Sequence, residues 1–251
     1  MTNRTSPANT SPRAGSARVS ARARRVMAAG AALGAGLMLT ACGVTDLAAP
    51  TKKATNTYDV TGETAVLHVA GGAGDVQVTE SGRTGFHVTE KLYWKGDKPV
   101  TRHPVDGDTL TLDYTCVDSG WACGVDYLVE VPRGVQVKVE AGSGDITLRA
   151  LSGKIDVHTG SGTIDAGGLG GKQAVAKAGS GDVDLRFTAA PDKVDVQTGS
   201  GTGTVQVPGG AYNVTVGTGS GDKEIGVTDD DSSPRTIVVR AGSGDAKVLA
   251  T

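Results

Sequence analysis

The sequence predicts an all-β fold: a β-solenoid, similar to a parallel β-helix, that stacks coils of about 20 residues beneath an aromatic-rich N-terminal cap region. Three observations predict it. A Gly-Ser-Gly motif recurs through the second half of the chain, and apolar residues alternate on both sides of each copy. Gly is also abundant, at 38 of 251 residues, whereas Phe, Trp and Tyr together number nine. This composition indicates many tight turns around a narrow interior.

The repeat is regular enough to define a unit. Successive serines of the motif are 18, 19, 20, 20 and 23 residues apart. The copies are centred on Ser143, Ser161, Ser180, Ser200, Ser220 and Ser243. Self-similarity at this period is typical of stacked repeats.

The residues around each motif predict two strands that share an inward face. The positions six and four residues before each Ser are apolar in every copy. The positions three and five residues after it are apolar except at Gly203 and Lys223. Alternation on both sides of a Gly-rich turn predicts strand, turn and strand. An antiparallel β-sandwich of consecutive hairpins is the alternative, but near-identical turns and inward residues favour stacking of each coil on the next. A fainter copy lies at Gly72 to Asp75.

The chain divides into four parts: a leader (residues 1–41), a flexible linker (42–57), an N-terminal β region or cap (58–136) and the repeat array (137–251). The leader has six Arg, no acidic residue and an apolar run over residues 26–40. That run is too short to span a bilayer and is typical of a cleaved signal peptide. It ends in Leu39-Thr40-Ala41-Cys42, which resembles the lipobox of bacterial lipoproteins. The resemblance implies that Cys42 is lipidated and begins the mature chain.

Export defines the expected location and partners. The mature chain would carry 19 basic and 27 acidic residues, since the leader removes six of the 25 basic ones and none of the 27 acidic ones. A net negative charge argues against nucleic acid or anionic lipid headgroups as partners. We therefore expect a lipid-anchored protein at the cell membrane, facing outside the cytoplasm and attached by acyl chains. Export by the general secretory or the twin-arginine route stays open.

Two further cysteines, Cys116 and Cys123, flank six residues. Cysteine pairs outside the cytoplasm normally oxidise, so we expect a disulfide. A metal pair and a redox pair are the alternatives, but the spacing fits neither a zinc cluster nor a Cys-x-x-Cys centre, and no His lies nearby.

Two candidate binding sites remain, one in the cap region and one in the repeat array. The aromatic residues of the cap, with Trp94 and Trp121 as the candidate binding residues, either close the apolar end of the stack or form a binding patch. The residue after each Gly-Ser-Gly is Asp or Thr. Asp222 and Asp245 would be neighbours in a stack and could bind calcium, whereas the alternative has each Asp accept hydrogen bonds from turn amides. No other cofactor is expected.

Several segments together resemble a known family. They are Tyr58-Asp59-Val60, Gly74-Asp75-Val76-Gln77-Val78, Asp106-Gly107-Asp108-Thr109-Leu110, Val131-Pro132-Arg133-Gly134-Val135 and the serial Gly-Ser-Gly-Asp coils. This set is similar to the bacterial putative adhesin family of β-strand-repeat proteins. The resemblance covers about residues 57–250 and implies a β-solenoid at the cell surface, for which the family has no established catalytic residues.

The expected function is therefore non-enzymatic. The first hypothesis is a lipid-anchored surface protein, adhesin-like or structural, that presents a β-rod to an unknown protein or cell-envelope partner. The second is a ligand-binding or sensory envelope module that uses the cap aromatics. An enzyme ranks third, because the sequence offers no nucleophile motif, metal motif or triad.

Overall fold

The computed structural model describes residues 50–62, 64–117 and 122–251. The predicted leader, the lipidation site Cys42 and the candidate binding residue Trp121 lie outside the described residues. The described part contains 21 strands and no helix, and hence no helix that could cross a membrane. The prediction of an all-β fold is confirmed.

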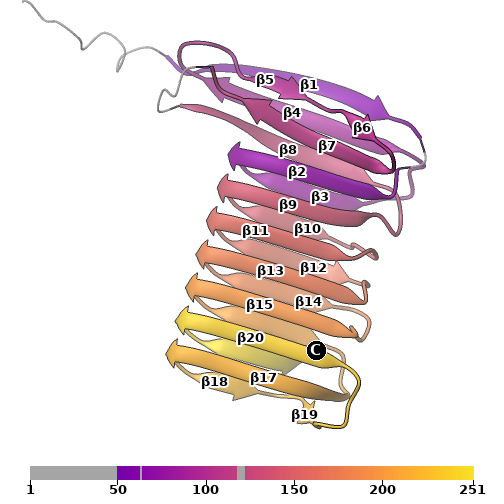
Figure 1. Ribbon diagram of the computed structural model, residues 1–251, viewed down its shortest axis with the longest axis vertical. Coiled ribbons are helices and arrows are strands. Elements are labelled where there is room, and N and C mark those ends of the chain that lie inside the picture. The colour runs from indigo at the N-terminus through magenta and orange to yellow at the C-terminus, as the bar shows by residue number, and fades with distance from the viewer. Residues whose placement is uncertain (1–49, 63, 118–121) are drawn as a thin grey trace, which may run out of the picture. The chain divides into compact units, whose positions relative to one another are not determined.

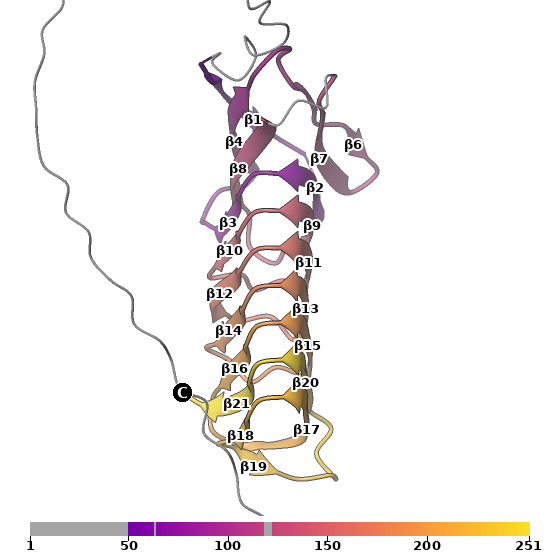
Figure 2. The same cartoon turned by 90° about the vertical axis from the view of Figure 1, so that its left-hand side faces the viewer.

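The strands form two sheets that are mostly parallel (Figures 1 and 2). The first sheet has, in spatial order, β1 (Lys52–Val60), β4 (Phe86–Trp94), β8 (Cys123–Val131), β3 (Val76–Glu80), β10 (Ile146–Arg149), β12 (Ile164–Leu169), β14 (Val183–Phe187), β16 (Gly203–Val207), β21 (Ala246–Ala250) and β18 (Lys223–Ile225). The second has β19 (Thr228–Asp229), β17 (Ala211–Ser220), β20 (Thr236–Ser243), β15 (Lys193–Ser200), β13 (Gln173–Ser180), β11 (Ile155–Ser161), β9 (Gln136–Ser143), β2 (Val66–Ala73), β7 (Thr109–Thr115) and β5 (Val100–Arg102), with β6 (Val105–Asp106) also paired to β7.

Each Gly-Ser-Gly turn joins one strand of the second sheet to one strand of the first, so every repeat contributes one rung. Equivalent residues stack on each other: Ser161 is level with Ser143 on one side and with Ser180 on the other. The pairing between these rungs is parallel throughout. Antiparallel pairing was the alternative for the whole fold. Among the described strands it occurs only toward the N-terminal end, where β4 lies between β1 and β8 and where β7 pairs with β5 and β6.

The core is the narrow space between the two sheets, and the alternating apolar residues fill it. Val137, Val157 and Val196 are fully buried, as the inward positions of the repeat predict. The two exceptions to the pattern have physical causes. A Cβ on Gly203 would lie 3.0 Å from Val239 Cγ1, so this inward position has little room for a side chain. Lys223 lies on the outermost rung, where its inward position is exposed to solvent.

The rungs do not follow the order of the chain. The C-terminal β20 and β21 lie between the rung of β15 and β16 and the rung of β17 and β18. The inserted rung is apolar, with Ile237 and Val239 fully buried, whereas all three residues of β18 are exposed. Burial of the apolar rung and exposure of a short charged edge strand lower the cost of ending the stack.

The prediction of a flexible linker over residues 42–57 was wrong for its last six residues. Residues 52–57 were expected in a flexible tether, but they belong to β1, which pairs along its length with β4. Their side chains alternate: Ala54, Asn56 and Tyr58 face inward and are partly buried, whereas Thr55 and Thr57 are exposed to solvent. This alternation was hidden because small and polar residues occupy most of its positions.

Candidate functional site

The Asp residues that follow the Gly-Ser-Gly turns have a structural role. The carboxylates of Asp145, Asp182 and Asp245, and that of Asp75 after the first Gly-rich turn, each accept a hydrogen bond from the backbone N–H of the equivalent residue one rung further along. The pairs, with their N to O distances, are Asp145 to Asp75 (3.0 Å), Thr163 to Asp145 (2.7 Å), Thr202 to Asp182 (2.7 Å) and Asp222 to Asp245 (3.0 Å). Asp75 N donates in the same way to Asp126 Oδ1 at 3.1 Å. The column therefore satisfies turn amides, which was the alternative to metal binding.

Asp222 and Asp245 are neighbours, as predicted, but the geometry favours this capping role over a calcium site. Asp245 Oδ1 accepts the Asp222 N–H, and Asp245 Oδ2 lies 3.0 Å from Lys247 Nζ. The hydrogen bond from Asp222 and the ammonium of Lys247 hold the pKa of Asp245 below its usual value. Within residues 50–62, 64–117 and 122–251, no three His, Cys, Asp or Glu side chains are grouped so as to hold a metal ion.

Trp94 lies at the end of β4 with 9 % of its surface exposed, packed against the core. The ammonium of Lys98 is 5.8 Å from the centroid of its ring. Two other aromatic residues of the cap, Phe86 and Tyr127, are also buried. A ligand could reach only a small part of the Trp94 ring, and the geometry favours the cap role for these aromatic residues.

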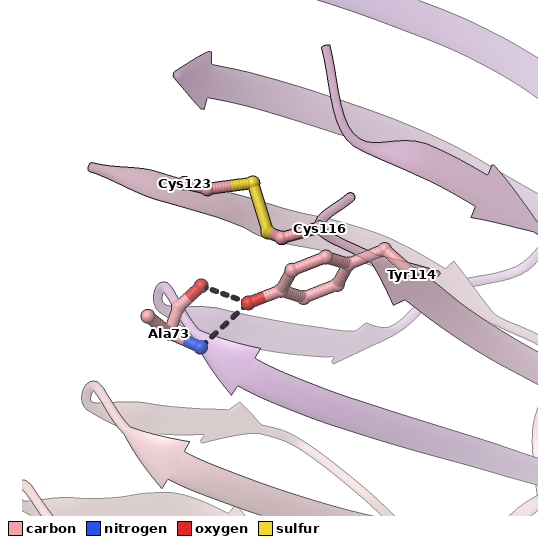
Figure 3. The surroundings of a disulfide bond; sticks show 4 residues. All are labelled: Ala73, Tyr114, Cys116 and Cys123. Atoms are coloured by element: carbon pink, nitrogen blue, oxygen red, sulfur yellow. Dashed lines mark hydrogen bonds between the residues drawn. A yellow bond between two sulfur atoms is a disulfide. The ribbon is translucent and has the colours of Figure 1, made fainter. Parts of the chain in front are cut away.

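The predicted disulfide is present (Figure 3). Cys116 and Cys123 are bonded, with their Cα atoms 6.2 Å apart. The bond joins the segment after β7, in one sheet, to the start of β8, in the other. Beside it, the Tyr114 hydroxyl donates to Ala73 O at 2.7 Å and accepts from Ala73 N at 2.5 Å. The Tyr114 hydrogen bonds join the first Gly-rich turn, at the end of β2, to β7.

A buried carboxylate holds β1 in place, and the sequence analysis missed it. Glu90 is fully buried and accepts hydrogen bonds from Tyr58 Oη (2.7 Å) and Asn56 Nδ2 (3.0 Å), both on β1. Burial, together with the Glu90 carboxylate, raises the pKa of Tyr58. The available signal was the alternation of β4, in which Glu90 stands at an inward position between Val88 and Leu92.

The outer face of the cap carries lysines around a shallow depression. Lys53 on β1, Lys91 and Tyr93 on β4, and Asp126 on β8 line a hollow of about 540 Å³. Lys53 is level with Tyr93, and Lys91 is level with Asp126. The hollow is open to solvent and has no buried catalytic group among the residues that line it.

Fold and surface thus define a class, an all-β protein of stacked rungs whose accessible features are outer faces and turns. Residues 63–251 match the model of the Toastrack DUF4097 family, and the chain belongs to that family. No curated protein matches the chain.

Solved structures of low sequence identity resemble this chain, and the first of them shares its fold. A protein from Clostridium sporogenes, described as a "putative cell adhesion protein", is 15 % identical with a TM-score of 0.50, and the match covers 80 % of this chain and 100 % of that one. A "putative adhesin" from Parabacteroides merdae is 12 % identical with a TM-score of 0.29, covering 78 % and 96 %. Another from Bacteroides fragilis is 14 % identical with a TM-score of 0.30, covering 80 % and 97 %.

Proposed function

We propose that this protein is a non-enzymatic, lipid-anchored surface protein, adhesin-like or structural, whose β-solenoid presents its outer faces to a cell-envelope or extracellular partner. Cys42 is the anchor, and the protein faces outside the cytoplasm. The lipobox-like tetrapeptide supports the anchor. The name of the Clostridium sporogenes protein is consistent with adhesion, although its similarity extends to the fold alone.

One observation carries the proposal. Equivalent positions stack in register from rung to rung, so each outer face presents equivalent side-chain positions about every 4.8 Å. On the second sheet, His158, Lys177 and Gln197 form such a column, and their side chains face solvent. A flat periodic face of this kind suits an extended or repetitive partner, because each rung offers the same geometry again.

The anchor is tested first. Replacement of Cys42 by Ser is expected to move the protein from the membrane fraction to the medium, because the acyl chains attached to the sulfur would be lost. Cell fractionation and the intact mass of the N-terminal peptide measure this change. An unmodified Cys42 in the wild-type protein, or a retained leader, would contradict the anchor.

Partner binding is tested by capture from cell-wall and culture-medium fractions with three forms of the protein as bait. They are the wild type, a variant of the second sheet (Lys177→Ala with Arg240→Ala) and a variant of the first sheet (Arg149→Ala with Arg186→Ala). An adhesive rod is expected to lose affinity when one of these exposed faces is changed. Capture that survives both changes but is lost with a fourth bait, Tyr93→Ala on the cap, would favour the ligand-binding or sensory module.

A further inference from the structure

Five lysines gather at one end of the cap. Lys52 and Lys53 begin β1, Lys91 lies on β4, and Lys95 and Lys98 follow the end of β4. Lys52 pairs with Trp94 and Lys53 with Tyr93, so the start of β1 and the end of β4 lie side by side. We call these five residues the lysine surface.

The side chains of the lysine surface are accessible. Lys52, Lys53, Lys91 and Lys98 are exposed, and Lys95 is partly exposed. Lys53 and Lys91 line the hollow described above, and Lys52 Nζ donates to Gly96 O at 3.3 Å. Within the described part of the chain, no carboxylate lies within salt-bridge distance of these five ammonium groups.

The lysine surface differs in charge from the rest of the chain. Residues 50–251 carry 19 basic and 26 acidic side chains. If Asp97 and Asp126 are counted with the lysine surface, it has five basic and two acidic residues. The rest of residues 50–251 then has 14 basic and 24 acidic residues, a net charge of −10. One end of the cap is thus positive, and the rest is strongly negative.

The lysine surface is also close in sequence to the proposed anchor, so this inference rests on the proposed function. Nine residues separate Cys42 from Lys52. Ten residue steps span at most about 36 Å when fully extended. A lipid-anchored Cys42 therefore keeps the start of β1 within reach of the headgroups of the same membrane.

We propose that the lysine surface binds the headgroups of anionic phospholipids in the membrane that holds the anchor. Lysine ammonium groups are attracted to anionic headgroups, whereas the acidic rungs are repelled by them. The two effects together turn the lysine end of the cap toward the lipid and the repeat array away from it. The array is then exposed to partners in the envelope or beyond it.

The test uses the lipidated protein, purified from membranes and reconstituted in vesicles. Amine-reactive acetylation, quantified by mass spectrometry, measures the accessibility of each lysine. In phosphatidylglycerol vesicles we expect labelling of Lys53 and Lys91 to be at least about fivefold slower than in phosphatidylcholine vesicles. Each lysine near an anionic surface raises the binding constant about fivefold. Lys177 and Lys193, exposed or half-exposed on the array, serve as controls and are expected to label equally in both.

Ionic strength and charge-reversal variants test whether the protection is electrostatic. The protection is expected to fall as ionic strength rises, because the attraction between exposed charges is screened. Without vesicles, the Cys42→Ser protein is expected to stay unprotected. With anionic vesicles, its flotation should fall in Lys53→Glu with Lys91→Glu and stay unchanged in Lys177→Glu with Lys193→Glu, which changes the charge equally.

The outcomes separate the two proposals. If the wild-type protein lacks acyl chains but the unlipidated protein still floats with anionic vesicles through Lys53 and Lys91, the anchor fails and the lysine surface stands. Equal labelling of all four lysines in both kinds of vesicle would overturn the lysine surface and leave the anchor intact. Protection by soluble polyphosphate without protection by anionic vesicles would also overturn it, since the occupant would then be a soluble polyanion.

Discussion

Replacement of Val239 by Asp is expected to lower the free energy of unfolding by about 4 kcal/mol or more, whereas the same change at Val216 should cost about 1 kcal/mol. The two residues occupy the same position on adjacent rungs and are level with each other. Val239 is fully buried because its rung is inserted between two others, whereas Val216 lies on the outermost rung and is only partly buried.

Urea denaturation of the two variants measures the difference. Comparison of the two variants tests the order of the rungs, because a stack in chain order would bury Val216 and leave Val239 on the terminal rung. Equal costs, or a larger cost at Val216, would contradict the inserted position of β20 and β21.

A second large effect is expected from Gly162→Ala, which should lower the free energy of unfolding by about 3 kcal/mol. Gly162 has a φ of +143°, a conformation that residues with a Cβ rarely adopt. A Cβ at this position would also overlap the carbonyl oxygen of Gly144 on the neighbouring rung. Both causes act at once, because the turn must bend sharply and the rungs must pack closely.

Gly217→Ala is the control for that prediction. Gly217 lies on β17 with a φ outside the left-handed range and no atom within 4 Å of an added Cβ. The change is expected to be neutral or to stabilise by up to about 1 kcal/mol, since Ala restricts the unfolded chain. Thermal unfolding of both variants by circular dichroism tests the contrast, and a Gly162→Ala protein as stable as wild type would refute the packing of the turns.

Local pattern was enough to predict the parts of the fold that repeat. The alternation around Ser161 and its copies defines which residues face inward, and the glycines define the turns. Cys116 and Cys123 are close in sequence, so their pairing needed no knowledge of distant contacts. The rung order could not be predicted, because stacking energy depends on which long-range partner each strand finds. Lys223, a charged residue at an inward position, was the one local sign of a terminal rung.

The cap was harder to predict because its contacts join distant segments without a repeat. Glu90 meets Asn56 and Tyr58 across more than 30 residues of sequence, and Tyr114 reaches Ala73 in the same way. Trp94 was noted as an aromatic residue, but sequence alone could not decide between a buried and an exposed ring. The lysine surface likewise exists only because β1 pairs with β4, whose lysines lie about 40 residues later in the chain.

Cysteine cross-linking of the turn serines tests the central claim, the in-register stack with an inserted C-terminal rung. Adjacent rungs place equivalent Cα atoms about 4.8 Å apart, within the range for a disulfide, whereas two rungs place them about 9.6 Å apart. Ser243 is level with both Ser200 and Ser220. We predict rapid disulfide formation in Ser200→Cys with Ser243→Cys, and in Ser220→Cys with Ser243→Cys, but none in Ser200→Cys with Ser220→Cys. A cross-link between positions 200 and 220 without one between 200 and 243 would contradict the account.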